Sequence, residues 1–262
     1  RSYLAQDMTP IAYAHGTKAP LEKNWNKKSA DKVDVDKDFI GNKSNIGILL
    51  GEPSGNLVDV DLDSSEAILL APIFLPPTDR RFGRPSTPDA HWLYKSDVPA
   101  TIPFSHNGKK DGMLVELRST GGQTMFPPSV HPCGERLSWA EEGDIPIVAA
   151  AALRTRVQHL ALAALLLRNW VEGTKNVLGL RVPGALLTHG WPREGVEALI
   201  TAVSEAAGDD ANALKKSLKR VEYTDRRLAS KRPCTGLPKL AEALSIDADV
   251  LRSWIDMRSE EE

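Results

Sequence analysis

The clearest pattern of apolar and polar positions lies at residues 57–63, where apolar residues and aspartates alternate with a period of two. Successive side chains on a β-strand point to opposite faces, so a strand here places Asp59, Asp61 and Asp63 on one face. Aspartate is a poor strand former, and neighbouring carboxylates repel one another. The row therefore predicts a compensating cation or, as the simpler alternative, a solvated strand end or loop.

Further apolar runs in the first 140 residues or so predict more strands, with turn residues between them. The expected strands cover 44–50, 91–94, 113–118, 123–126 and 137–139. Ser64 carries the hydroxyl of a helix N-cap, and a helix is expected over 64–70. The sequence predicts a helix and loop for 1–43, a loop for 72–88 and irregular structure for 98–110.

The composition changes near residue 141, after which Ala and Leu dominate and the strand pattern ends. Breaks at Gly and Pro divide this part into helices at 150–171, 178–190, 192–207 and 211–229, a helical stretch at 236–254 and a charged tail at 258–262. The predicted fold class is α+β. A domain with a mixed or antiparallel sheet at 1–145 precedes an all-helical domain at 146–262.

The bulk composition is that of an ordinary globular chain. Its 262 residues are 41% hydrophobic and 26% charged with a net charge of −2, so no overall positive field indicates a nucleic-acid binder. A local basic run remains: on a helix, Lys215, Lys219 and Arg226 share roughly one face, which suits phosphates. The alternative is a solvated surface balanced by Glu222 and Asp225.

Cysteine usage and hydropathy indicate the compartment. Cys133 and Cys234 are far apart and outside any CxxC, so neither a disulfide framework nor a Cys-rich zinc site is supported, and a reducing cytoplasm is expected. No apolar run reaches the length of a membrane span, and no signal peptide opens the chain. The first residue is Arg rather than Met, as expected for a piece of a longer protein.

Ionisable residues interrupt otherwise apolar strands at Asp59, Asp61, His91 and Glu116. Buried carboxylates need partners, and oxygen ligands without cysteine favour Mg²⁺ or Mn²⁺ over Zn²⁺. Asp59 and Asp61 could hold one ion and Glu116 could bridge to a second, and two such ions support in-line phosphoryl displacement. The alternatives are an ion pair of Glu116 with Arg118 or another arginine, and a hydrogen-bonded core role for His91.

Basic residues close to these strands could hold a triphosphate. They are Arg80, Arg81, Arg84, Arg118 and His131. The glycine-bearing turn at 51–55 is not a P-loop, because the Gly-Lys-Ser/Thr ending is missing.

Several short motifs follow one another in the order of one known family. They are 16–20 with Trp25, 45–47 with Gly51, 54–55 with 58–61, 91–94, 115–118, and 121–122 leading to 127–131, Gly134 and Trp139. This order, over about residues 10–140, resembles the primase–polymerase domain of the archaeo-eukaryotic primase superfamily, as in replication proteins of plasmids and phages. The helical part is similar to the primase C-terminal-type helical domain that follows it in such proteins.

The resemblance implies a primase-like catalytic domain with an RRM-like core and two Mg²⁺ or Mn²⁺ ions. It assigns these ions to Asp59 and Asp61, with Glu116 at the third acidic position. Asp63 adds a further alternating acid, so the pair Asp61 and Asp63 stays open. The implied nucleotide-binding residues are His91, Arg118, Ser129 and His131, to which the arginine pattern adds Arg84. The helical module is expected to hold the template through Lys215, Lys219 and Arg226.

The expected function is that of a template-directed nucleotidyltransferase, a DNA primase and polymerase that makes primers in replication. Its expected partners are a single-stranded DNA template, nucleoside triphosphates and a replicative helicase domain or protein, with no membrane. Two other classes stay open at this stage. One is a metal-dependent nuclease or phosphodiesterase, and the other is a non-catalytic nucleic-acid-binding initiator module.

Overall fold

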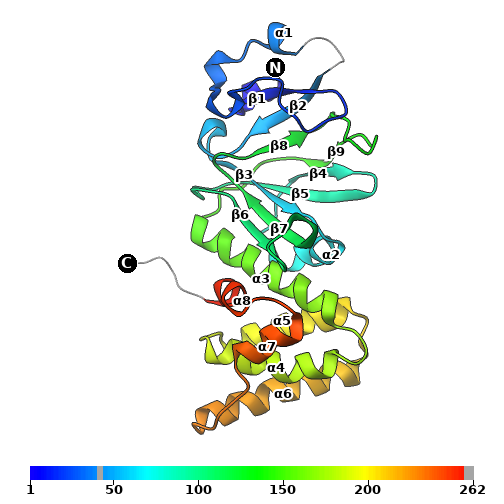
Figure 1. The fold of residues 1–262 in the computed structure, drawn as a ribbon, viewed down its shortest axis with the longest axis vertical. Coiled ribbons are helices and arrows are strands. Elements are labelled where there is room, and N and C mark those ends of the chain that lie inside the picture. The colour runs from blue at the N-terminus through cyan, green and yellow to red at the C-terminus, as the bar shows by residue number, and fades with distance from the viewer. Residues whose placement is uncertain (40–43, 257–262) are drawn as a thin grey trace. The chain divides into compact units, whose positions relative to one another are not determined.

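A computed structural model describes residues 1–39 and 44–256 of the chain. The chain divides into two compact units, each assembled from separate segments. Unit 1 comprises residues 1–63, 76–103 and 116–154, and unit 2 comprises 64–75, 104–115 and 155–262. The predicted α+β fold class is confirmed, because strands fill the first part of the chain and helices the second (Figure 1). The charged tail expected at 258–262 lies outside the described residues.

A three-stranded antiparallel sheet belongs to unit 1. It consists of β1 (Pro10–Ala14), β2 (Ser44–Leu49) and β8 (Gln123–Phe126), in the order β1-β2-β8. Strands β2 and β8 agree with the prediction, but the expectation of only helix and loop before residue 39 is wrong at β1. Four of the five β1 residues are buried, so β1 has no alternating polar face that could mark it as a strand.

A six-stranded sheet follows, in the order β6-β7-β3-β5-β4-β9. Its strands are β6 (Ile102–Ser105), β7 (Met113–Arg118), β3 (Leu57–Leu62), β5 (Thr87–Lys95), β4 (Arg80–Arg84) and β9 (Ser138–Glu142). Strands β3 and β7 match the expected ones closely, and β5 extends the predicted 91–94 at both ends. Strand β9 begins one residue after the start of the predicted 137–139 and ends three residues beyond it. Strands β3 and β5 pair antiparallel, as do β4 with β5 and β4 with β9.

Strands β4 and β6 correct the prediction of a loop at 72–88 and of irregular structure at 98–110. Strand β4 contains three arginines and no apolar run, so its sequence does not read as a strand. Two of these arginines are stabilised by acidic residues of the neighbouring strand β9. Arg80 is opposite Glu142 and Arg81 is opposite Glu141, with the Arg81 guanidinium 2.7 Å from the Glu141 carboxylate. Strand β6 spans only four residues and contains a proline, which hides the pattern of a strand.

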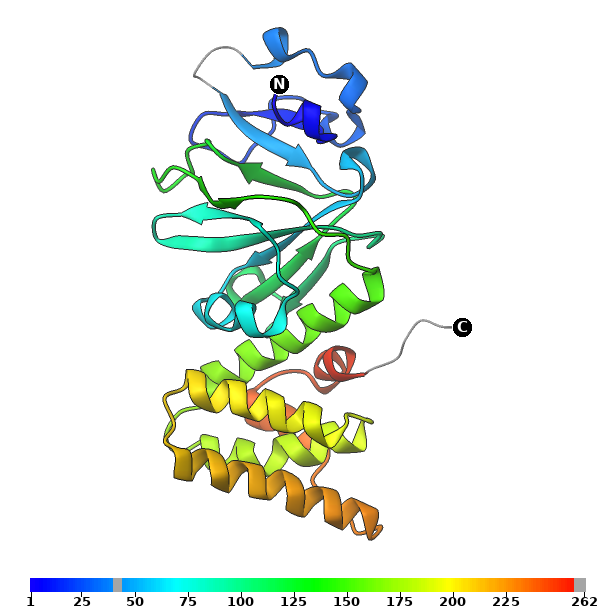
Figure 2. The ribbon, with the colours of Figure 1, turned by 180° about the vertical axis from the view of Figure 1, so that it is seen from behind.

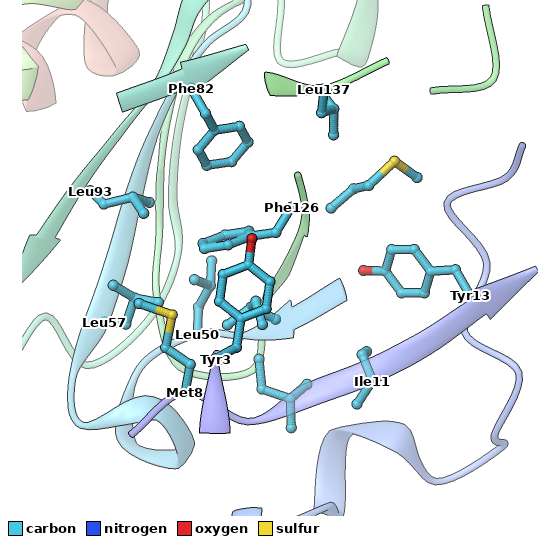
Figure 3. Close-up of a cluster of buried hydrophobic side chains, with 13 residues drawn as sticks. Tyr3, Met8, Ile11, Tyr13, Leu50, Leu57, Phe82, Leu93, Phe126 and Leu137 are labelled. Carbon is cyan, nitrogen blue, oxygen red and sulfur yellow. The ribbon is translucent and has the colours of Figure 1, made fainter. Parts of the chain in front are cut away.

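Aromatic and aliphatic side chains from both sheets form the core of unit 1 (Figure 3). The ring of Phe126 from β8 lies at the centre, 4.8 Å from Phe82 of β4 and 5.6 Å from Tyr3, measured between ring centroids. Tyr13 from β1 reaches the same cluster and is fully buried. Burial of one such large side chain stabilises a fold by about 1.5–3 kcal/mol, so this cluster fixes how the two sheets meet.

Eight α-helices are described, most of them in unit 2. They are α1 (Val35–Asp38), α2 (Ser65–Phe74), α3 (Ala150–Asn169), α4 (Lys175–Thr188), α5 (Arg193–Ala206), α6 (Ala211–Ala229), α7 (Leu237–Leu244) and α8 (Ala248–Ile255). The Ser64 hydroxyl accepts a hydrogen bond from the Ala67 amide at 3.2 Å, as its predicted N-cap role requires. The helices expected after residue 150 are confirmed, with the last stretch divided at Ser245.

Helices α4, α5 and α6 run alongside one another in unit 2 (Figure 2). Helix α6 exposes a strongly polar face and ends in a basic turn with Arg226 and Arg227. Within the described part of the chain, none of the helices combines the length and the apolar character that a membrane crossing requires.

Candidate active site

The ionisable strand residues converge around β3, which lies between β7 and β5 in the sheet. Asp61 of β3 is directly opposite His91 of β5 in the antiparallel register, and Asp59 is opposite Leu93. Glu116 and Arg118 come from β7, on the other side of β3. The sequence-predicted acids and His91 are therefore brought together within unit 1.

Three carboxylates form a group that could hold a metal ion. One oxygen each from Asp61, Asp63 and Glu116 lie within 4.8 Å of one another, the one such group among the described residues. Asp61 is buried, Glu116 is half-buried and Asp63, which follows the last residue of β3, is exposed. All three donors are hard oxygens without a thiolate, so the set fits Mg²⁺ or Mn²⁺.

The crowding of these acids changes the proton affinity of Asp63. Neighbouring protein removes water from part of its carboxylate, and the charge of Asp61 adds repulsion, which together raise the pKa of Asp63 to about 6. A carboxylate that resists ionisation in this way gains most from a nearby cation. The group of three thus contains both members of the pair that the sequence leaves open, Asp61 and Asp63.

Asp59 lies outside this group of three and has different partners. Its carboxylate is completely buried, accepts a hydrogen bond from the Thr124 hydroxyl at 2.7 Å and lies 3.0 Å from His91 Nδ1. Burial opposes its ionisation, but His91, Arg118 and the Thr124 hydroxyl outweigh burial and lower the pKa of Asp59. Asp59 is thus an ionised residue that orients its neighbours, and its expected place as a metal ligand stays a prediction.

His91 is held on three sides. Its ring stacks on Phe82 with 4.4 Å between ring centroids, and Nδ1 lies 3.0 Å from Asp59 and 3.4 Å from Asp61. Burial disfavours the charged imidazolium, but the two carboxylates outweigh burial and raise the pKa of His91. With Nδ1 committed to the carboxylates, the other ring nitrogen, Nε2, is the one that can meet a ligand.

Arg118 binds two of the three clustered acids. Its Nη2 lies 2.5 Å from Asp61, and its Nε lies 2.5 Å from Glu116. The neighbouring Asp61, Asp59 and Glu116 carboxylates outweigh the effect of burial and raise the pKa of Arg118 above its already high ordinary value. The ion pair of Glu116 with Arg118, one of the alternatives considered from the sequence, is therefore present beside the acidic group.

A loop after β8 carries Ser129 and His131, two of the other predicted nucleotide-binding residues, and the third, Arg84, comes from β4. Arg84 Nη1 lies 3.3 Å from His131 Nδ1. Burial, together with the positive charges of Lys18 and Arg84, lowers the pKa of His131. Ser129 is buried, and its hydroxyl accepts a hydrogen bond from the Ile46 amide at 2.8 Å, so its described role is to fix the loop to β2. A contact of Ser129 with a nucleotide stays a prediction.

Two of the arginines considered for a triphosphate are paired elsewhere. Arg80 lies over the Trp139 ring at 5.2 Å and 3.7 Å from Glu142. Arg81 lies over the Trp92 ring at 4.8 Å and pairs with Glu141. These contacts join β4 to its neighbours, so of the arginines on this strand it is Arg84 that faces the predicted nucleotide-binding loop.

In unit 2, the predicted template residues lie on α6. Lys215 and Lys219 line an open hollow of about 370 Å³ together with Asn212, Lys216, Arg220 and Tyr223. Arg226 does not line this hollow, and its guanidinium pairs with Glu222 at 3.1 Å. The basic surface of α6 therefore centres on Lys215 and Lys219, with Tyr223 as an exposed aromatic ring at its side.

Sequence reasoning gave no role to two residues that support the site: Thr124, and Asn45, which it named only as part of the motif at 45–47. Thr124 donates to Asp59, and Asn45, which is buried, binds both backbone groups of Val130 in the loop before His131. A threonine in a strand is ordinary, so no signal marks Thr124. Asn45 was a better candidate, because an amide at the start of a buried strand needs partners.

A comparison with protein families adds one finding. The family described as "Bifunctional DNA primase/polymerase, N-terminal" (Prim-Pol) matches residues 1–153, which include every residue of the site in unit 1. No curated protein matches the chain.

Proposed function

We propose that this chain, which belongs to the Prim-Pol family of bifunctional DNA primase/polymerase N-terminal domains, synthesises primers on single-stranded DNA and extends them. The family is of the nucleotidyltransferase type. The observation that carries it is the convergence of Asp61, Asp63 and Glu116 within 4.8 Å beside His91 and Arg118.

The three clustered carboxylates would hold two Mg²⁺ or Mn²⁺ ions. Such ions activate an attacking hydroxyl and stabilise the leaving oxygen of an in-line displacement at phosphorus. The reaction is attack of a 3′-hydroxyl on the α-phosphate of a nucleoside triphosphate, which forms a phosphodiester bond and releases pyrophosphate. The chain contributes Asp61 and Asp63 from the end of β3 and Glu116 from β7.

The remaining residues bind and orient the substrate. Asp59 fixes Nδ1 of His91, so that Nε2 can donate to a phosphate oxygen. Beside the loop after β8, the Arg84 guanidinium and the His131 imidazole would bind phosphate oxygens. Arg118, which is paired with the acids in the described structure, would move from them to the triphosphate. In unit 2, Lys215 and Lys219 would hold the phosphates of the template, with Tyr223 offering a face for a base.

An incorporation assay tests the proposal. Purified chain is incubated with single-stranded DNA, labelled nucleoside triphosphates and Mn²⁺ or Mg²⁺, and products are sized on a gel. Lengthened products that disappear in Asp61→Asn and Asp63→Asn support it. Shortened DNA would instead indicate a nuclease, and binding of DNA without incorporation under either metal would indicate an initiator module.

A further inference from the structure

Lys18 sits in a tight turn that the fold holds in place. Strand β1 ends at Ala14, and Gly16 follows with a φ of +68°, a conformation that favours glycine. The Thr17 hydroxyl donates to the Ala14 carbonyl at 2.9 Å, and the Ala14 amide donates to the Ala19 carbonyl at 3.3 Å. Lys18 thus extends from an ordered backbone.

One buried amide joins this turn to the predicted nucleotide-binding loop. Nδ2 of Asn45 donates to the Val130 carbonyl at 2.7 Å, and the Val130 amide donates to Asn45 Oδ1 at 2.9 Å. The same Nδ2 lies 3.5 Å from the Thr17 carbonyl. Lys18 and His131, each one residue beyond these contacts, are therefore carried on two neighbouring segments that share Asn45 as their brace.

The ammonium of Lys18 is set among the charges of the site. It interacts electrostatically with Asp61 and Asp63 and with the cations of Arg118 and Arg84, and its own charge acts on His131. Partial desolvation by the surrounding protein lowers the pKa of Lys18. Within residues 1–39 and 44–256, no hydrogen bond or ion pair engages this ammonium. It differs in this from Arg118, whose charge is paired with Asp61 and Glu116.

Lys18 is an exposed cation without a direct anionic partner among the described residues, and Asn45 holds its turn beside the loop of His131. An anionic ligand fits this position. We infer that Lys18 binds the terminal phosphates of the incoming nucleoside triphosphate and the pyrophosphate that leaves. Metal ions at the three acids would neutralise the reacting α-phosphate. Lys18 is not bonded to those acids, so it can bind the β- and γ-phosphates. Its flexible side chain can keep contact with them as pyrophosphate leaves.

This inference rests on the proposed function, and its test measures binding, so that it does not depend on incorporation. Affinities for a deoxynucleoside triphosphate and the matching monophosphate are measured with Mn²⁺ by calorimetry for wild type, Lys18→Ala, Lys18→Arg and Lys23→Ala. Lys18→Ala removes one charge-assisted hydrogen bond, so its affinity for the triphosphate should fall by roughly 10- to 100-fold relative to wild type. Its affinity for the monophosphate should stay within about threefold of the wild-type value. Lys18→Arg restores part of the affinity.

Lys23 is exposed, lies in the same segment and serves as the control for the removal of one positive charge. Its alanine variant should bind both nucleotides as wild type does. Equal weakening of mono- and triphosphate in Lys18→Ala, or an unchanged triphosphate affinity in a variant whose Tm matches wild type, overturns the inference. Wild type that binds triphosphate but never incorporates it overturns the proposed function alone, while wild type that binds no triphosphate overturns both.

Discussion

Arg118 Nη2 lies 2.5 Å from an Asp61 oxygen, within the group of carboxylates that is the candidate metal site. The same guanidinium also reaches Glu116, so it neutralises two acids that a cation would need. A cation and Arg118 must therefore compete for these oxygens. A nucleotide that draws Arg118 to its phosphates would, by the same linkage, make room for the metal.

This competition predicts an increase in metal affinity when Arg118 is removed. In Arg118→Gln, Mn²⁺ without nucleotide should bind more tightly, by roughly 5- to 150-fold, because a rival cation is gone and two carboxylates are released. Triphosphate affinity should fall in the same variant. Mn²⁺ titrations followed by electron paramagnetic resonance, with and without nucleotide, measure both effects. Weaker Mn²⁺ binding in Arg118→Gln would show that the arginine supports the metal site instead of competing with it.

Asp59 and Asp61 should behave differently although they are two residues apart. Asp61→Asn removes a clustered oxygen and should lower Mn²⁺ affinity by more than the 10- to 100-fold or so that is typical when only a supporting group is removed. In Asp59→Asn, the loss of Mn²⁺ affinity should be within or below that range. The same variant should lower the pKa of His91, because the Asp59 carboxylate raises that pKa in wild type. Titration of the His91 ring by NMR checks this. A comparable fall in Mn²⁺ affinity in both variants would restore Asp59 as a ligand.

Helix α6 offers a test of which basic residues meet DNA. Alanine at Lys215 and Lys219 should weaken single-stranded DNA binding and reduce the salt slope by roughly 0.7 for each phosphate that the variant no longer neutralises. Arg226→Ala is the matched control, because Arg226 is paired with Glu222 outside the hollow, and it should change the slope little. Fluorescence anisotropy over a salt series measures the slopes. A larger effect at Arg226 would move the template-binding surface toward the end of α6.

His159 makes the free energy of unfolding depend on pH. Burial, helped by the charge of Arg156, lowers the pKa of His159 to about 4, and its ring lies 4.2 Å from that of Trp191. The unfolded chain takes up this proton near pH 6.5 and the folded chain does not. Stability should therefore fall as pH drops from about 6.5 toward 4, by up to about 3 kcal/mol. In urea titrations, His159→Gln should flatten this part of the pH profile.

Alanine substitutions at two glycines, Gly47 and Gly195, should change the stability of the fold in opposite directions. A Cβ at Gly47 of β2 would overlap the ring of Tyr13, which is fully buried and cannot yield, so Gly47→Ala should destabilise the fold by about 1–3 kcal/mol. A Cβ at Gly195 in α5 meets only ordinary contacts, the nearest being Pro192 at 3.4 Å. Gly195→Ala should stabilise by about 0.5–1 kcal/mol through helix propensity. Thermal unfolding of both variants compares them directly, and a neutral Gly47→Ala would mean that Tyr13 can move.

The helices of unit 2 could be predicted well because each carries its own boundaries, such as the Asp210 side chain that caps α6. Strand β4 could not, because its stability comes from Glu141 and Glu142, far along the chain, and no local pattern contains them. The residues that meet at β3 were found because charges in apolar strands are conspicuous. The sequence did not predict which two aspartates group with Glu116, because a period of two places Asp59 and Asp63 on the same face of the strand. Asp63 joins the group because it lies just beyond Leu62, where β3 ends.

The hydrogen bond from Thr124 to Asp59 has a consequence for folding, because Thr124 belongs to the three-stranded sheet and Asp59 to the six-stranded one. Until β8 has docked, the buried carboxylate of Asp59 lacks that donor. Docking of the three-stranded sheet on the six-stranded one is thus required for the described arrangement of the candidate site. A nascent or partly opened chain would carry the same acidic residues without the Thr124 hydroxyl that helps to hold Asp59 beside His91.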